Sequence, residues 1–327
     1  ASLKYDEQKG IPMLKRIFIF ILKTITWLVG LLALALLAIF LYHRFQIAQE
    51  SKLIEKPIGQ LVEVEGKKLN VYTAGKGKKT LVFLAGLGTN APVLDFKALY
   101  SKLEEDYRIV VVERLGYGYS DDGNDDRSLD RQVEQTRKAL KAAKISGPYV
   151  LVPHSIAGLE TIHWANHYPE EVEAIIGLDM TMPHTEVADQ QKFYGSYQTI
   201  QLGRMLGLAR LPIFFDENSS PAIKSGALND QEKAIFKALF HQRSITQAVM
   251  NEVKNRKKNV ETINKEPVPQ IPTLIFAAVQ KGGEAPKLEE EFVAQNAQAK
   301  LVTLEGSHYI HDEKPEEIAQ QIKEFLK

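Results

Sequence analysis

The sequence predicts an α/β protein with a mostly parallel, doubly wound sheet, one N-terminal transmembrane helix and a helical cap insertion. Strands alternate with helices along residues 59–327, which is typical of a parallel sheet covered on both faces. An apolar run near the N-terminus is long enough to cross a bilayer. The chain has 327 residues, 44% of them hydrophobic, so it can build one large domain after this helix.

The composition excludes several classes of function. There is no cysteine, which excludes disulfides, thiolate catalysis and cysteine-based metal sites. The formal net charge is +0, so nothing favours nucleic acid or another strongly charged partner. The glycine-rich turns AGLGT and GYGYS lack the spacing of a nucleotide site, and we expect no cofactor.

Residues 17–43 form the predicted transmembrane helix. Thr24 to Tyr42 carries no charge, and roughly 20 apolar residues are enough to span a bilayer. The alternative is a cleaved signal peptide, but its apolar core should be only about 7–15 residues, so we favour an uncleaved anchor. Cations are more frequent before the span than after it. We therefore expect residues 1–16 in the cytoplasm and, after a linker at 44–58, an extracellular domain on a single-pass protein of the cell membrane.

The domain at 59–327 begins with three short β-rich segments inside residues 59–86, separated by Gly-Lys turns. Continuous apolar runs such as TLVFLAG indicate strands that are buried on both faces. Further strands are expected at 107–116, 147–155, 172–180, 272–279 and 300–306. Helices are expected at 93–105, 128–145, 156–169, 288–297 and 315–327.

The cap at about 181–267 interrupts this alternation, because its patterns are helical and contain no buried strand. Within it, RMLGLARLPIFF (204–215) is apolar with two cations. We interpret it as the core of the cap, with a tunnel lining or a membrane contact as alternatives.

The stretch PHSIAG (153–158) places Ser155 between a predicted strand and a predicted helix. Serine needs an adjacent base and backbone N–H groups that stabilise an oxyanion. A sharp strand-to-helix turn exposes the hydroxyl and supplies one donor, the N–H of Ile156. Pro153 and Ala157 hold positions where such turns usually have glycine. Alanine is the smallest replacement and proline is tolerable at a strand end, so we predict that Ser155 is a nucleophile.

Residues 60–327 resemble the α/β-hydrolase family, and the chain looks like a membrane-anchored bacterial serine hydrolase. FLAGLGTNAP is similar to the family's oxyanion loop, with Ala85 where histidine is usual. ERLGYGYSDD is similar to its D-R-x-G-x-G-x-S stretch, with Glu113 replacing aspartate. GPYVLVPHSIAGLE matches the nucleophile turn, and GSHYIHDEKPEEIAQQIKEFL looks like the terminal histidine segment. The resemblance implies the α/β-hydrolase fold.

The resemblance also implies roles for individual residues. His308 stands in the position of the base, and His311 is the runner-up, which we interpret as lying behind the site or at the surface. Leu87 would supply the second oxyanion N–H beside that of Ile156. The substrate contacts expected beside them are Gly86 and His154.

The acid that orients the base has two candidates. The resemblance places it after the strand at 272–279, where Gln280 and Lys281 stand and Glu284 is the nearest carboxylate. Some members of the family take it one strand earlier, where Asp179 follows a buried strand directly. We favour Asp179 and keep Glu284 as the alternative.

His163 and His167 stand four apart on one predicted helix, a spacing that can hold a metal. Trp164 occupies the glutamate position of the zinc motif, and the sequence offers no evident third ligand. We interpret both histidines as packing or surface residues and predict no metal.

The expected reaction is hydrolysis of a small or medium carboxylic ester through an acyl-enzyme, with a lipid-derived substrate suggested by the anchor. One alternative is a proline-iminopeptidase-like aminopeptidase, which would need a carboxylate cluster such as Glu186, Asp189 and Asp216. A second is a non-catalytic binding protein on the same fold. A haloalkane dehalogenase is disfavoured, because its nucleophile should be aspartate.

Overall fold

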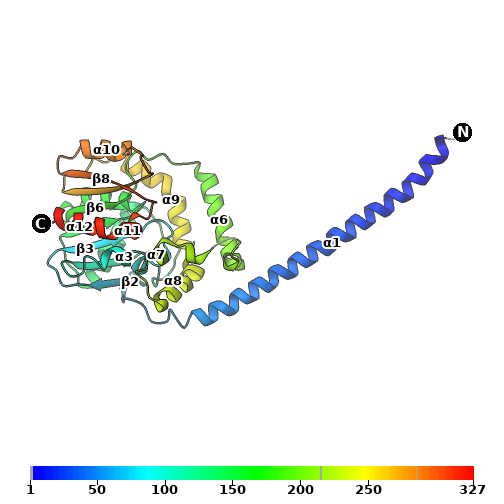
Figure 1. Ribbon diagram of the computed structural model, residues 1–327, viewed down its shortest axis with the longest axis horizontal. Helices are drawn as coiled ribbons and strands as arrows, with labels where there is room; N and C mark the ends of the chain where they lie inside the picture. The colour runs from blue at the N-terminus through cyan, green and yellow to red at the C-terminus, as the bar shows by residue number, and fades with distance from the viewer. Residues whose placement is uncertain (1–2, 214–215, 285) are drawn as a thin grey trace.

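The structure, a computed structural model, describes residues 3–213, 216–284 and 286–327. A single long helix, α1 (Leu3–Glu50), extends away from an α/β domain (Figure 1). By length and composition, its segment Lys15–Glu50 could cross a membrane. The helix runs past residue 43 into the expected linker, because residues 44–50 contain neither glycine nor proline. It also runs back through the expected segment 1–16, of which residues 1–2 lie outside the described part of the chain.

The domain is built on one eight-stranded sheet with strand order β1-β2-β4-β3-β5-β6-β7-β8. β1 is antiparallel to β2 and β2 to β4, whereas all other neighbours are parallel. The predicted mostly parallel sheet is therefore confirmed. The strands are β1 (Gln60–Val64), β2 (Lys67–Ala74), β3 (Thr80–Leu84), β4 (Arg108–Glu113), β5 (Tyr149–Pro153), β6 (Val172–Leu178), β7 (Thr273–Val279) and β8 (Ala299–Glu305).

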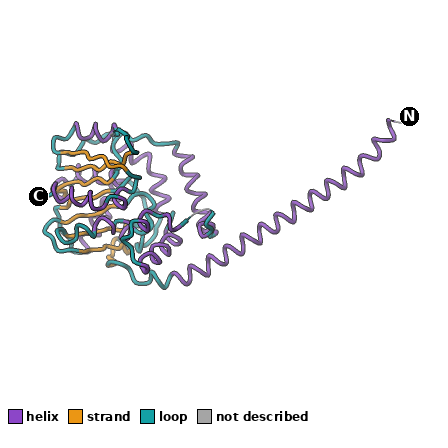
Figure 2. The backbone as a smooth tube through the Cα atoms, in the orientation of Figure 1, coloured by secondary structure: helices purple, strands orange, loops and turns teal. Residues whose placement is uncertain are grey.

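Helices cover both faces of the sheet (Figure 2), because alternate side chains of a strand point to opposite faces. Val82 and Leu84 of β3 pack in the core under the first set of helices, and Leu81 and Phe83 in the core under the second. The first set is α4 (Leu129–Ala142), α5 (Ala157–His167) and α10 (Lys287–Ala294). The second is α2 (Pro92–Asp95), α3 (Lys97–Tyr100), α11 (Ile310–Glu313) and α12 (Pro315–Phe325).

Between β6 and β7 the chain forms helices, and the described residues 180–213 and 216–272 include no strand. We call residues 180–272 the helical insertion. Its helices are α6 (Gln190–Leu206), α7 (Pro221–Lys224), α8 (Asp230–Arg243) and α9 (Gln247–Ile263). Short 3-10 turns occur within the insertion at Leu208–Arg210 and Glu217–Ser219. Another, at Pro169–Glu171, lies before β6.

The prediction that residues 204–215 form the core of the cap is wrong for Met205 and Ile213. Met205 is 55% exposed and Ile213 is 85% exposed. The segment lies at the edge of the insertion and packs against the last turns of α1. Phe214 and Phe215 lie outside the described residues.

Candidate active site

The chain turns sharply between β5 and α5 at Ser155. Its φ is 55°, in the left-handed region that residues other than glycine rarely occupy. Such a conformation costs on the order of 1–3 kcal/mol and persists only where the surrounding structure fixes it. Pro153 ends β5 and Ala157 begins α5, so neither departure from glycine prevents the turn.

Two nearby glycines permit close approaches around this turn. A Cβ at Gly158 would lie 2.6 Å from the carbonyl oxygen of Thr181. A Cβ at Gly86 would lie 3.0 Å from the Cβ of Ser155 and 3.0 Å from Nδ1 of His154. The loop after β3 therefore passes directly over the Ser155 turn at Gly86, and the segment after β6 packs against the start of α5 at Gly158. A larger residue at either glycine would push the packed segments apart.

Asp179 and His308 are in contact. Asp179 follows β6, and its Oδ1 accepts a hydrogen bond from the N–H of Ala278 in β7 at 2.8 Å. Its Oδ2 lies 2.5 Å from Nδ1 of His308, which follows β8. Glu313 holds the turn before His308 by accepting from the N–H and the hydroxyl of Ser307. The other candidate acid, Glu284, is exposed after β7 and is not among the residues that line the cavity described next.

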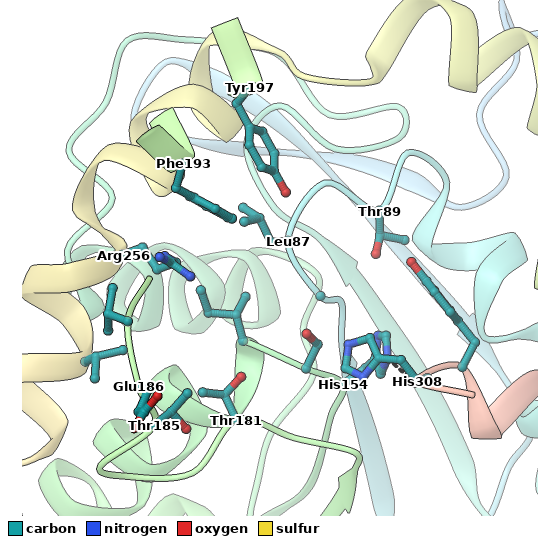
Figure 3. Close-up of a pocket in the computed structure, with 16 residues that line it drawn as sticks. Leu87, Thr89, His154, Thr181, Thr185, Glu186, Phe193, Tyr197, Arg256 and His308 are labelled. Atoms are coloured by element: carbon teal, nitrogen blue, oxygen red, sulfur yellow. Dashed lines mark hydrogen bonds between the residues drawn. The ribbon is translucent and has the colours of Figure 1, made fainter. Parts of the chain in front are cut away.

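A cavity of about 300 Å³ lies between the Ser155 turn and the helical insertion. Figure 3 shows His154 and His308 on one side of it, with Phe193 and Tyr197 of α6 across from them. The rest of the lining is Gly86, Leu87, Thr89, Ser155, Ile156, Thr181, Thr185, Glu186, Val187, Arg256, Val260 and Tyr309.

Two backbone donors in this lining are available to a ligand. Among the described residues, none accepts a hydrogen bond from the N–H of Leu87 or of Ile156. Both residues line the same cavity as Ser155 and His308. A negatively charged oxygen next to Ser155 could therefore be stabilised by backbone N–H groups, as acyl transfer requires.

His154, which we expected to contact substrate, holds the loop of His308. Its Nε2 lies 3.0 Å from the main-chain oxygen of His308 and must donate, since a carbonyl only accepts. Burial lowers the pKa of His154 well below its usual value, and the neighbouring His311 and His308 lower it further. His154 is therefore a neutral donor that positions His308, although it also lines the cavity.

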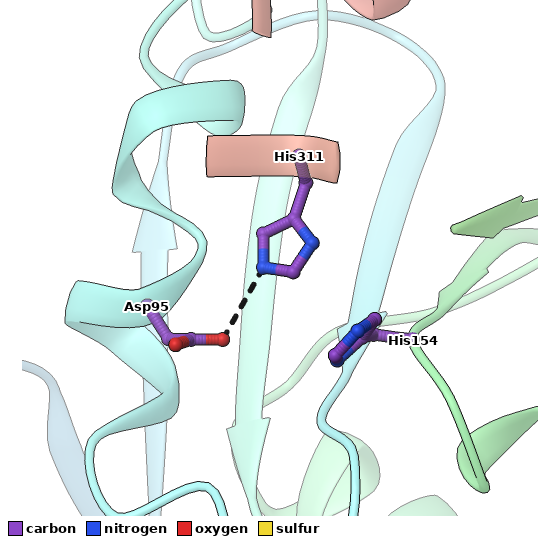
Figure 4. A group of neighbouring side chains, drawn as sticks. All are labelled: Asp95, His154 and His311. Atoms are coloured by element: carbon purple, nitrogen blue, oxygen red, sulfur yellow. Dashed lines mark hydrogen bonds and ion pairs between the residues drawn. The ribbon is translucent and has the colours of Figure 1, made fainter. Parts of the chain in front are cut away.

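His311 is fully buried, so the surface alternative for this residue is wrong. Its Nε2 lies 3.3 Å from Oδ2 of Asp95, and its ring centroid lies 4.6 Å from that of His154 (Figure 4). Asp312 is buried on the same side, and burial together with the charge of Asp95 raises its pKa to about 9. The sequence pattern around His308 did not reveal Asp95, because it lies on α2, far away in the chain.

Residues 79–315 match the family model described as alpha/beta hydrolase fold. The chain belongs to the alpha/beta hydrolase family. It is 36% identical to the uncharacterized protein YbdG of Bacillus subtilis (strain 168) over 320 residues, which cover 92% of this chain and 95% of that protein. The resemblance seen in the sequence is therefore confirmed at the level of the family.

Solved structures share the fold of this alpha/beta hydrolase. An epoxide hydrolase from Bacillus megaterium superposes with a TM-score of 0.62 at 21% identity, covering 82% of this chain and 99% of that one. The enol-lactonase from Burkholderia xenovorans LB400 superposes with a TM-score of 0.61 at 15% identity, covering 82% and 99%. At these identities the likeness shows the fold alone.

A buried ionic network in this alpha/beta hydrolase has no signal in the sequence. Arg114 is 3% exposed, and its guanidinium lies 3.1 Å from Glu160 of α5 and 3.2 Å from Glu252 of α9. It also donates to the main-chain oxygen of Ala85 at 2.7 Å. The network therefore connects the loop carrying Leu87 to α5 and to the helical insertion. Residue spacing could not reveal it, because the three charged residues lie on separate elements.

His163 and His167 have a neighbour that could also bind a metal, Glu266, which no sequence spacing relates to them because it lies 103 residues after His163. His163 lies 2.5 Å from Glu266 through Nδ1 and 2.9 Å from Asp130 through Nε2. Burial lowers the pKa of His163, but these two hydrogen bonds outweigh it and raise the pKa above its usual value. Both ring nitrogens are engaged by carboxylates, so the packing interpretation accounts for the group.

The carboxylates expected for an aminopeptidase do not gather in the cavity. Only Glu186 lines it. Asp189 instead caps α6 by accepting from the N–H groups of Gln191 and Lys192. Asp216 accepts from the N–H of Asn218 at the start of a 3-10 turn.

Glu113, the residue that replaces the family's aspartate, should make stability depend on pH. It is fully buried and accepts from Tyr119 and Asn70, and burial raises its pKa from 4.5 to about 7. Because the pKa of Glu113 is higher in the folded state, its contribution to the free energy of unfolding is fully present below about pH 4.5. That contribution is lost as the pH rises through about 7. The glutamine variant Glu113→Gln cannot ionise. Between pH 4.5 and pH 8, we expect the free energy of unfolding of this variant to fall by about 3 kcal/mol less than that of the parent.

Thermal unfolding of the parent and of Glu113→Gln at pH 4.5, 6 and 8 measures this difference. Other ionisable groups are common to both proteins and cancel in the comparison. Parallel pH profiles would contradict the expectation.

Proposed function

We propose that the chain is a serine hydrolase that cleaves carboxylic esters through an acyl-enzyme. Ser155 is the nucleophile, His308 the base and Asp179 the orienting acid. The observation that carries the proposal is the contact of Asp179 Oδ2 with His308 Nδ1 at 2.5 Å, at a cavity that Ser155 and His308 both line. The left-handed turn at Ser155 supports it, because backbone strain of this kind is typical of a nucleophile turn.

The proposed first half-reaction forms the acyl-enzyme. Nδ1–H of His308 donates to Asp179, which leaves the lone pair of Nε2 free to accept a proton. Ser155 Oγ attacks the ester carbonyl carbon as its proton passes to His308, and the carbonyl oxygen becomes an oxyanion. The N–H groups of Leu87 and Ile156 stabilise that oxyanion. The C–O bond of the ester then breaks, and His308 returns the proton to the departing alcohol.

In the second half-reaction a water molecule repeats the attack on the acyl-enzyme. His308 accepts a proton from the water and returns it to Ser155 Oγ as the Ser155 ester bond breaks, and the carboxylic acid is released. The cycle consumes one water molecule and restores Ser155 and His308. No cofactor takes part in these steps.

The cavity supports a small or medium ester as substrate. Its volume is about 300 Å³, at the lower end of the range for small-molecule sites. Apolar side chains such as Leu87, Val187 and Phe193 line much of it, which suits an acyl chain. We propose a lipid-derived ester, with α1 as a membrane anchor and the domain on the extracellular side.

An activity-based probe tests the proposal. The full chain in detergent micelles should be labelled by a fluorophosphonate, whereas Ser155→Ala and His308→Ala should lose labelling while remaining folded. The control is Ser101→Ala, because this hydroxyl donates to the main chain of Ala98, away from the cavity lining. It should be labelled like the parent.

The other outcomes assign a different function. Absence of labelling in a folded parent would overturn the proposal and favour a non-catalytic binding protein. A labelled parent that cleaves aminoacyl amides faster than aliphatic esters would overturn the ester assignment in favour of an aminopeptidase.

A further inference from the structure

Helix α6 and the segment after it, up to Ile213, have one face toward the cavity and one toward the outside. Phe193 and Tyr197 line the cavity, and Gln201 donates to a main-chain oxygen of the insertion on the same side. The outward side chains include large apolar residues that are more than half exposed. These are Leu202 (56%), Met205 (55%) and Ile213 (85%).

The charge pattern of this segment is also unusual. Residues 190–215 contain no aspartate or glutamate, although 41 residues of the chain are acidic. Of its three cations, Lys192 is exposed, whereas Arg204 donates inward to the main chain of Gln242 and Arg210 binds Glu50. The outer surface therefore combines exposed apolar side chains with an absence of acidic groups. We call Leu202, Met205 and Ile213 the apolar rim.

The apolar rim is fixed to the end of α1 by direct contacts. Arg210 forms a bidentate ion pair with Glu50 at 2.7 Å and 2.7 Å, and its Nε donates to Nδ1 of His43 at 2.9 Å. Gly207, with φ of 84°, packs so closely that a Cβ there would lie 2.4 Å from the Cβ of His43. We call these four residues the α1 junction. A bidentate, partly buried pair of this kind holds orientation better than an exposed one.

The α1 junction begins where the apolar run of α1 ends. The uncharged stretch from Thr24 stops at Tyr42, one residue before His43. Tyr42 and Glu50 are separated by about 12 Å along a helix that rises about 1.5 Å per residue. The headgroup region on each side of a bilayer is about 5–8 Å thick. A bilayer around the apolar run of α1 would therefore have its surface at the level of the junction and of the apolar rim.

The arrangement of the elements agrees with this position. Figure 1 shows α6 on the side of the domain toward which α1 extends, whereas α12 lies on the opposite side. The apolar rim thus belongs to the face of the domain that is nearest to the length of α1.

We propose that the apolar rim lies on the lipid bilayer into which α1 is inserted. Helices with an apolar outer face bury it at the boundary of headgroups and acyl chains. The absence of acidic residues avoids repulsion from anionic lipids. A second copy of the chain could also cover an apolar face. We infer the bilayer because the rim is continuous, through the α1 junction, with a helix of membrane-spanning length.

This placement makes α6 the layer between lipid and cavity, since Phe193 and Tyr197 on its inner side line the cavity. The proposal concerns membrane contact only. It does not depend on the proposed ester hydrolysis, and its readout is not an activity.

The experiment uses the absence of cysteine from the full chain. Single cysteines at Leu202→Cys and Ile213→Cys carry an environment-sensitive fluorophore. The control is Gln320→Cys on α12, which is exposed on the opposite side of the domain (Figure 1). The proteins are reconstituted in vesicles of phosphatidylcholine and phosphatidylglycerol, with or without brominated acyl chains.

Brominated lipid should remove more than about half of the fluorescence at positions 202 and 213 and leave position 320 unchanged, because an interfacial face is buried about 5–10 Å. Quenching at 202 and 213 by aqueous iodide to the same extent as at 320 would overturn the proposal. Energy transfer between labelled copies at position 202, without quenching by brominated lipid, would also overturn it and assign the face to a second copy.

A charge swap tests the α1 junction. Glu50→Arg places two cations together and should reduce lipid quenching at position 202. Adding Arg210→Glu restores an opposite-charge pair and should restore the quenching. Equal quenching in the parent, the single variant and the double variant would show that the junction does not hold the rim on the bilayer.

Discussion

Replacing Asp179 with asparagine is expected to lower kcat for ester hydrolysis about 10⁴-fold, the loss typical of a triad without its orienting carboxylate. Oδ2 of Asp179 lies 2.5 Å from Nδ1 of His308. A carboxylate there selects the tautomer with a proton on Nδ1 and a free lone pair on Nε2. An amide can present its NH₂ group instead, which favours the tautomer that cannot accept the proton of Ser155. The measurement is kcat at saturating substrate, together with circular dichroism to establish folding.

The matched control is Glu284→Gln. It makes the same carboxylate-to-amide change at the alternative acid, which is exposed and does not line the cavity. Its kcat should equal that of the parent. The reverse ranking of the two variants would transfer the role to Glu284. An undiminished kcat in both would mean that Ser155 and His308 work without an acid.

The second large effect is expected at Arg114. Arg114→Met should destabilise the protein by about 3–5 kcal/mol, because removing one partner leaves Glu160 and Glu252 buried without their cation. This loss corresponds to a fall in Tm of roughly 10 °C. The hydroxyl of Tyr117 donates to Glu252 and accepts from the N–H of Gly88, so the loop that carries Leu87 depends on the same network. Fluorophosphonate labelling of the variant should therefore slow at temperatures at which it is still folded.

Lys257→Met is the control for the loss of a cation. Lys257 lies 3.9 Å from Glu261 on α9, with side chains that are 60% and 56% exposed. An exposed helical pair of this spacing stabilises by only about 0.5 kcal/mol. Thermal unfolding of the two variants in the same detergent compares them. Equal losses would contradict a special role for the buried network.

Much of the fold was accessible from the sequence, because its signals are local. The apolar run TLVFLAG predicted a strand buried on both faces, and β3 is buried at all five of its positions. The turn at Ser155 was accessible for the same reason, since a strand, a small-residue turn and a helix follow each other directly. The end of α1 was less accessible, because nothing in RFQIAQE stops a helix and tertiary contacts at Glu50 support its last turns.

The choice between the two acids was open in the sequence and depends on the order of the sheet. β6, β7 and β8 lie side by side, so Asp179 at the end of β6 is two strands away from the loop of His308. Ala278 of β7, between them, holds one carboxylate oxygen and leaves the other facing the histidine. Distance along the chain, 129 residues between Asp179 and His308, carries no information about this contact.

The sequence by itself determined the alternation of strands and helices, the apolar helix, the Ser155 turn and the family. Each of these follows from residues that are neighbours in the chain, where periodicity and side-chain size act directly. The tertiary structure alone decided that Asp179 meets His308, that Arg114 joins Glu160 and Glu252, and that Arg210 binds the end of α1. The physical reason is that such contacts join charged groups from separate elements. Their meeting depends on how whole helices and strands pack, which no local pattern contains.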